Sequence, residues 1–166
     1  LKNEAPPPRP EAHVDIGVSA FIPKTYIASD RQRLEAYRRM TRCSSLEMLA
    51  ALKQDWIDAF GEPPRQIEVL IALTELRLLA GIFGIDKIIR QEPDIVLTVR
   101  DAMRASTALT GAPGSLRVID EKTVYMRMPA VFLEPETSLI VLRNLLRGNH
   151  DKSATGVPAP ASAGAN

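Results

Sequence analysis

The first half of the chain carries apolar residues at the three- and four-residue spacing that is typical of amphipathic helices. Two capping boxes indicate where these helices begin. Ser29 is followed by Gln32, and Ser44 is followed by Glu47, so each serine is placed to cap the first turn of a helix. We therefore expect one helix to open at Ser29 and a second helix to open at Ser44.

The second helix ends at Gly61, which two prolines follow. Its inner stripe is formed by six residues at helical spacing: Leu46, Leu49, Lys53, Trp56, Ile57 and Phe60. Pro64 begins a third helix, which ends at Gly84 and is apolar on most of its sides. Such a helix is expected at the centre of a fold, because every side needs an apolar neighbour.

After Ile85 the pattern changes to short strands. In chain order the pattern predicts strands 85–91 and 95–100, a short helix 101–109, and strands 116–120 and 123–128. A last amphipathic helix begins at Pro135 and is expected to stop at Gly148. The sum is an α+β fold, in which a helical half with three helices precedes a small, mostly antiparallel sheet with packed helices.

The two ends of the chain differ in composition from its centre. We expect residues 1–13 to form a proline-rich linker and residues 148–166 to form a disordered tail of small residues. The folded domain is then 14–147, and it begins with an extended segment. Because the first residue is a leucine, we expect a piece of a longer protein.

Composition narrows the function classes. The net charge is +1, which speaks against nucleic-acid binding driven by overall charge. The single cysteine, Cys43, excludes an internal disulfide and fits a reducing compartment, so we expect a cytoplasmic protein. The longest apolar stretch, 67–85, is interrupted by charged residues and is read as a buried helix, not as a membrane span.

The residues needed for common kinds of catalysis are missing from the predicted fold. The sequence has no G-x-x-x-x-G-K-[ST] loop for phosphate binding. Its two histidines, His13 and His150, fall in the predicted linker and tail, so a metal site or a Ser-His-Asp arrangement would lack its ligand or base. We expect no catalytic residue, no metal and no cofactor in this chain.

The run DWIDAFG near the end of the second helix carries two acids on the side away from the inner stripe. Asp55 and Asp58 share that side with Met48, Ala51 and Ala59. A mixture of small, apolar and acidic residues is typical of a face that another protein covers, and an ordinary solvated face is the second interpretation. An acid/base pair is a third and weaker interpretation, because it needs a pocket that excludes water.

The first helix carries five arginines: Arg31, Arg33, Arg38, Arg39 and Arg42. We interpret this run as a solvated or protein-contacting face, with Arg31, Arg38, Arg39 and Arg42 as a secondary contact. The alternative is a module that contacts nucleic-acid phosphates. Against it, we expect no aromatic residue to interleave with the arginines.

Three short motifs in a fixed order resemble a known family. They are IP-x-x-YI (Ile22-Pro23, Tyr26-Ile27), RL-x-x-YRR (Arg33-Leu34, Tyr37-Arg38-Arg39) and an acid-x-x-D-x-FG run (Asp55, Asp58, Phe60-Gly61). With the long apolar helix that follows, they are similar to the C-terminal domain of bacterial transcription-repair coupling factors, the Mfd family. The likeness extends over Val14–Ile88.

The resemblance implies a regulatory, non-catalytic role. Members of the family are ATP-driven DNA translocases that displace stalled RNA polymerase and bind UvrA through a UvrB-like module; the motor motifs are absent here. It implies that this domain packs on the UvrB-like module of its own parent chain and masks the UvrA-binding surface. Asp55 and Asp58 match the acidic contact positions, whereas Ala59 stands where the family usually has arginine. DNA binding by this domain alone and membrane contact are not expected.

Overall fold

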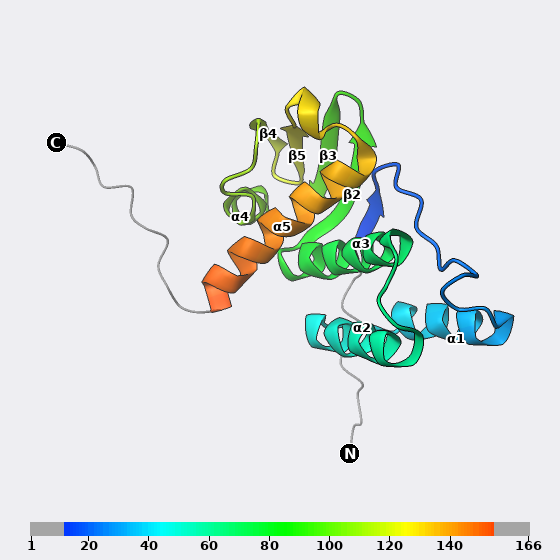
Figure 1. Cartoon of the computed structure of the whole chain (residues 1–166). Coiled ribbons are helices and arrows are strands. Elements are labelled where there is room, and N and C mark those ends of the chain that lie inside the picture. Colours follow the sequence, from blue (N-terminus) through cyan, green and yellow to red (C-terminus); the bar gives the residue numbers. More distant parts are fainter. Residues whose placement is uncertain (1–11, 155–166) are drawn as a thin grey trace, which may run out of the picture.

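The computed structural model describes residues 12–154 (Figure 1). Its helices are α1 (Asp30–Thr41), α2 (Leu46–Phe60), α3 (Arg65–Ile82), α4 (Ala102–Ala108), α5 (Pro135–Ala154) and a 3-10 turn, η1 (Ala130–Phe132). Its strands are β1 (His13–Asp15), β2 (Ile85–Gln91), β3 (Asp94–Val99), β4 (Ser115–Asp120) and β5 (Thr123–Arg127). The predicted α+β fold is confirmed.

The five strands form one sheet in the order β1-β2-β3-β5-β4. The two predicted hairpins, β2–β3 and β4–β5, are antiparallel, and β3 and β5 join them in the middle of the sheet. The short strand β1 is parallel to β2, with Val14 opposite Ile88. The sheet is therefore mostly antiparallel, as the alternation of its side chains predicts.

Helix α3 belongs to both hydrophobic cores of the described chain. Leu76 and Leu79 pack with the sheet, α4 and α5, whereas Ile67 and Ile71 pack with α1, α2 and the loop before α1. Figure 1 shows α3 between α5 and the sheet on one side and α2 on the other. The prediction of a central helix is confirmed, and the reason is that each of its faces serves a different core.

The start of α1 is predicted correctly, whereas the start of α2 is displaced by one residue. The side chain of Ser29 accepts a hydrogen bond from the amide of Gln32 at 3.3 Å. In α2 the capping residue is Ser45 and not Ser44, because the Ser45 hydroxyl accepts from the Met48 amide at 3.1 Å. The predicted stop at Gly61 is confirmed, with φ +90 at that glycine.

The predicted boundary at Gly148 is wrong, since α5 continues to Ala154. Past the glycine the helix is anchored by two contacts. The Asn149 side chain donates to the carbonyl of Ala108 at 2.7 Å, and the His150 ring packs edge-on against Phe83 with centroids 6.3 Å apart. These contacts offset the cost of a mid-helix glycine, about 1 kcal/mol relative to alanine.

Both histidines therefore lie in regular structure, which corrects the prediction that they fall in flexible ends. His13 is the first residue of β1 and is paired with Lys87, and His150 lies in α5. The extended segment predicted to follow residue 13 is a strand only as far as Asp15. The remainder of the predicted linker, 1–11, and of the predicted tail, 155–166, lies outside the described residues.

Candidate protein interface

Helix α2 presents its buried face to α3 and to the loop before α1. Leu49, Leu52 and Trp56 are buried, and Trp56 is only 4% exposed. The predicted stripe omitted Leu52, which is fully buried, and included Lys53 and Ile57, which are half-buried. The buried face is thus turned toward Leu52. The signal that could have found it is the three-residue spacing from Leu49.

The five residues predicted for the interface are all exposed. Met48 is 46% exposed and is one of several large apolar side chains that this fold leaves exposed. Ala51, Asp55, Asp58 and Ala59 are exposed on the same helix. We call these five residues the α2 flank. That a partner covers it remains a prediction.

The α2 flank contacts a cation of α1 that helical spacing does not connect to it. Arg39 of α1 forms an ion pair with Asp55, and their side chains are 47% and 55% exposed. Asp58 instead accepts a hydrogen bond from Gln54 at 2.9 Å on its own helix. An exposed ion pair of this kind contributes about 0–1 kcal/mol, so Asp55 is held in place only weakly.

Three of the five α1 arginines lie close to carboxylates of this chain, although two of them stay largely exposed. Arg33 donates to the carbonyl of Ile27 at 3.0 Å and pairs with Asp30, while Arg38 lies 3.8 Å from Glu35. With Arg39 on Asp55, three of the five guanidinium groups are partly neutralised. This arrangement weakens the case for a phosphate-binding helix.

The prediction that no aromatic residue accompanies these arginines is wrong. Tyr37 of α1 is exposed, and Phe21 in the preceding loop is 48% exposed. The Tyr37 hydroxyl accepts a hydrogen bond from the Ile22 amide at 2.6 Å, which places Phe21 beside α1. The loop has no helical periodicity, so sequence spacing alone could not show that its backbone bonds to Tyr37.

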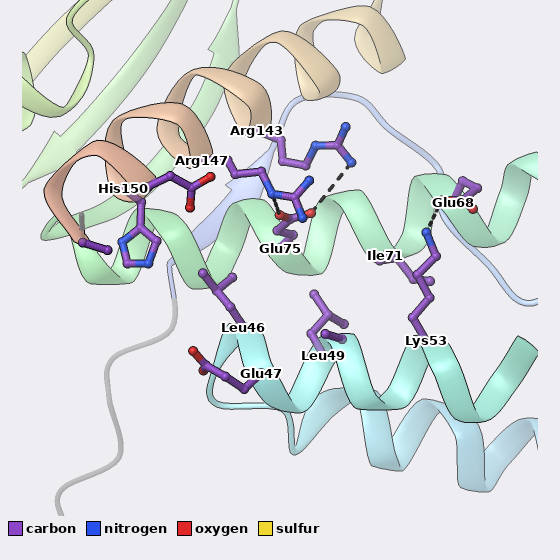
Figure 2. A pocket seen from close by; sticks show the side chains of 13 residues that line it. Leu46, Glu47, Leu49, Lys53, Glu68, Ile71, Glu75, Arg143, Arg147 and His150 are labelled. Carbon is purple, nitrogen blue, oxygen red and sulfur yellow. Dashed lines mark hydrogen bonds and ion pairs between the residues drawn. The ribbon is translucent and has the colours of Figure 1, made fainter. Parts of the chain in front are cut away.

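A groove of about 520 Å³ lies between α2, α3 and α5. Figure 2 shows its apolar side chains, among them Leu46, Leu49 and Ile71, with charged side chains of α2, α3 and α5 around them. The groove carries charges of both signs, and the most buried of them are paired. Its charged groups therefore act first as ties between the three helices.

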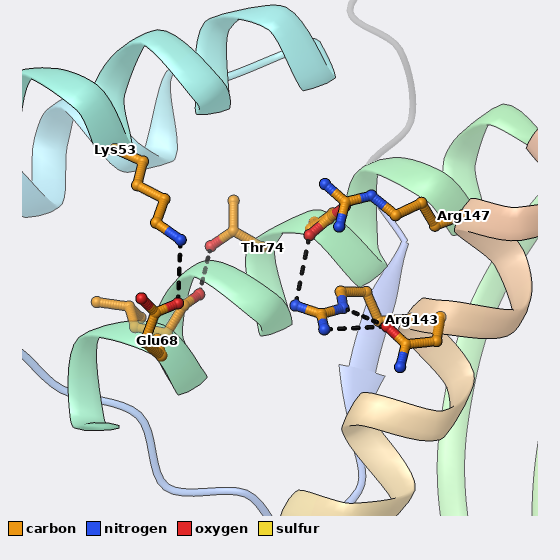
Figure 3. Close-up of polar contacts among 8 residues, drawn as sticks. Lys53, Glu68, Thr74, Arg143 and Arg147 are labelled. Atoms are coloured by element: carbon orange, nitrogen blue, oxygen red, sulfur yellow. Dashed lines mark hydrogen bonds and ion pairs between the residues drawn. The ribbon is translucent and has the colours of Figure 1, made fainter. Parts of the chain in front are cut away.

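The ties are two sets of ion pairs, which Figure 3 shows from another side. Lys53 of α2 lies 3.2 Å from Glu68 of α3. The buried carboxylate of Glu75 lies 2.9 Å from Arg147 and 3.7 Å from Arg143, both on α5. A buried carboxylate held by two arginines is satisfied and structural, and it is not a free acid or base.

Other candidate chemistry is limited. Within residues 12–154, no group of three or more His, Cys, Asp or Glu side chains is arranged to hold a metal ion. Burial raises the pKa of the Cys43 thiol, although the nearby Arg39 opposes this, so the thiol is a packed side chain in the second core. None of the helices described is long and apolar enough to cross a membrane.

This geometry defines a class of protein: a small α+β domain with an exposed, charged flank on one helix. The TRCF domain family matches residues 16–108, which is more than half of the chain. The chain belongs to this family. The match runs from the loop before α1 through α4, so it includes every residue of the α2 flank.

Individual relatives agree with the family. The chain is 30% identical over 96 residues to a transcription-repair-coupling factor of Bacillus subtilis, covering 57% of this chain and 8% of that protein. It is 41% identical over 75 residues to the one of Mycobacterium bovis, covering 45% of this chain and 6% of that protein. The chain thus spans less than a tenth of these relatives.

The fold has a solved counterpart. A crystal structure of the C-terminal domain of a transcription-repair coupling factor matches with a TM-score of 0.63 and 17% identity, covering 86% of this chain and 95% of that one. At this identity the match concerns the fold. Together with the family match it confirms the resemblance that the three sequence motifs indicated.

Proposed function

We propose that this chain is the autoinhibitory C-terminal domain of a transcription-coupled DNA repair translocase. It packs on the UvrB-like module of its own parent chain and masks the surface that binds UvrA. The observation that carries the proposal is the α2 flank: an apolar Met48, two small alanines and two acids, all exposed on one helix of a TRCF domain. UvrA and RNA polymerase are then indirect partners.

The proposed mechanism is steric masking coupled to a population shift. The domain binds the closed arrangement of the parent and not the open one, so it favours the closed state by the difference between the two affinities. A closed state that outnumbers the open one a hundredfold requires about 2.7 kcal/mol of difference. A small interface with one desolvated apolar anchor and one or two charge contacts is sufficient for this.

The chemistry of the flank sets what the partner surface must offer. Asp58 is held only by a neutral amide, so it can accept a guanidinium or ammonium group from the partner. Met48 fits an apolar depression, and Ala51 and Ala59 allow the backbones to approach closely. The UvrB-like module should therefore present a cation beside an apolar hollow.

The test is a titration of this chain against the isolated UvrB-like module. Asp55→Lys/Asp58→Lys should weaken binding at least about tenfold, because like charges across an interface cost several kcal/mol. The matched control is Glu121→Lys/Asp151→Lys, which makes the same change of net charge at two exposed acids away from the flank. The affinity of this control should stay within about twofold of that of the unchanged chain. Charges outside the interface act on binding only through long-range electrostatic fields.

A second readout separates loss of docking from loss of folding. Asp55→Lys faces Arg39, so the double reversal should lower stability slightly, by less than about 1 kcal/mol. In the full-length parent the same reversal should raise UvrA binding. Equal affinity of the reversed and control variants, with UvrA binding unchanged, would show that the α2 flank is an ordinary solvated surface.

A further inference from the structure

A second exposed surface lies on α1, away from the α2 flank. Its apolar part consists of Leu34 and Tyr37 on the helix and Phe21 on the preceding loop, and Leu34 is 51% exposed. We call this part the apolar row. A basic row beside it is formed by Arg31 and Arg38, both exposed. We call these five residues the α1 outer face. The opposite side of the helix, with Ala36 and Met40, is buried in the second core.

The apolar row is held in place by the fold. Leu34 and Tyr37 are three residues apart and so lie on one side of the helix. The hydrogen bond from the Ile22 amide to the Tyr37 hydroxyl ties the loop backbone, one residue after Phe21, to the helix. Half-exposed Leu and Tyr side chains on one side of a helix, with a half-exposed Phe on the loop tied to that helix, form a surface of the kind that a partner anchors on.

The spacing of the basic row points to the kind of partner. With Leu34 and Tyr37 at positions a and d of a heptad, Arg31 and Arg38 both fall at position e, seven residues apart. Charges at e select a partner helix with the opposite charge along its facing edge. Only Glu35 opposes this row on α1, and it lies 3.8 Å from Arg38 in a loose pair.

We propose that the α1 outer face binds an acidic amphipathic helix of a partner protein. Apolar residues of that helix pack on Leu34, Tyr37 and Phe21, and its carboxylates face Arg31 and Arg38. This surface shares no residue with the α2 flank. Among the described residues, one ion pair joins the two helices, and its arginine, Arg39, is not part of the α1 outer face. Each surface can thus be tested without the other.

The alternative partner is single-stranded nucleic acid, and the surface favours a protein. Nucleic-acid grooves need a continuous basic track with aromatic platforms. Here the face carries two arginines seven residues apart and no continuous basic track, Leu34 offers no stacking face, and Arg33 and Arg39 already face carboxylates. An aliphatic anchor beside two arginines instead matches the apolar and acidic faces of a helix.

The test uses the full chain and a designed peptide as the probe. The peptide is a helix of about three heptads, with leucine at a and d and glutamate at e and g, carrying a fluorescent label. A matched peptide has lysine in place of every glutamate. Anisotropy should report saturable binding of the acidic peptide and at least about tenfold weaker binding of the lysine peptide, since its charges would repel Arg31 and Arg38.

Variants of the chain then locate the site. Arg31→Glu/Arg38→Glu should weaken binding of the acidic peptide at least about tenfold and improve binding of the lysine peptide. Leu34→Ala should weaken both peptides, and Asp55→Lys/Asp58→Lys should change neither. All these positions are exposed, so circular dichroism should show an unchanged fold.

Three results would overturn the proposal. The first is equal binding of the acidic and lysine peptides, which would indicate apolar stickiness only. The second is no saturable binding of the acidic peptide. The third is tighter binding of a thymidine 20-mer than of the peptide, displaced by the same arginine reversals, which would identify the surface as a nucleic-acid site. The reversals at Asp55 and Asp58 report on the α2 flank alone, so failure of one proposal is distinguishable from failure of the other.

Discussion

Replacing Trp56 with alanine should lower the free energy of unfolding by about 3–5 kcal/mol. Trp56 is the only tryptophan of the chain and is 4% exposed in the second core, against Leu52 and Ile67, which are fully buried. Its carbonyl oxygen also accepts a hydrogen bond from the Tyr26 hydroxyl at 3.2 Å. The backbone contact survives the substitution, so the cost comes from the side chain.

The magnitude follows from the area that the indole buries. An aromatic side chain of this size removes about 150–250 Å² from water, of which alanine retains a small part. At about 25 cal/mol per Å², the lost transfer energy is on the order of 3 kcal/mol, and the remaining cavity adds more. Because α3 joins both cores, the loss should appear in one cooperative transition and not in the helical half alone.

The assay is urea unfolding followed by circular dichroism at the helical band, since the variant has no tryptophan fluorescence. Met48→Ala is the matched control on the same helix. It removes a large apolar side chain that is 46% exposed, and stability should change by no more than about 0.5 kcal/mol. A loss below about 1 kcal/mol for Trp56→Ala, or equal losses for the two variants, would refute the assignment of the two faces of α2.

Four further predictions follow. The hydrogen bond from Arg127 lowers the pKa of Asp94. The stability that the Asp94 carboxylate contributes is therefore present above the usual Asp pKa of about 3.9 and is lost as the pH falls below that value. Asp94→Asn should flatten this loss in urea unfolding midpoints measured from about pH 5 to about pH 2. Gly114→Ala should cost at least about 2 kcal/mol in thermal unfolding, since φ is +84 and a Cβ would lie 2.0 Å from the Arg127 carbonyl oxygen. Ala59→Arg should tighten binding to the UvrB-like module about tenfold or more in the titration, because a shielded charge-assisted hydrogen bond contributes about 1.5–3 kcal/mol. The chain alone should show no saturable ATP binding in calorimetry, because its sequence carries no phosphate-binding loop.

Local signals in the sequence predict most helices and strands. The features that they do not predict, the end of α5 and the strand β1, depend on contacts between residues far apart in the sequence. Ser29 caps α1 through its own first turn, so the motif is sufficient. Gly148 is a good stop signal locally, yet Asn149 donates to the carbonyl of Ala108, the last residue of α4 and 41 residues away in sequence, and the helix continues. Likewise β1 exists because Val14 pairs with Ile88, a partner that no local periodicity reveals.

The candidate interface shows the same division. Helical spacing predicts that Asp55 and Asp58 are exposed, because one helix fixes their direction. It does not predict that Arg39 reaches Asp55, since that contact depends on how α1 and α2 pack. Nor does it bring the backbone of Ile22 to the Tyr37 hydroxyl, which requires the loop before α1 to fold back.

Because Arg39 already pairs with Asp55, a partner that docks at Asp55 would exchange one ion pair for another and would not add a new one. A partner cation that takes Asp55 displaces Arg39, so the number of ion pairs is the same before and after. Contributions of this kind nearly cancel in their dependence on salt, because one screened contact replaces another. The displaced guanidinium is then free to meet an acid on the partner, so a partner that carries both signs of charge is preferred over one that is only basic.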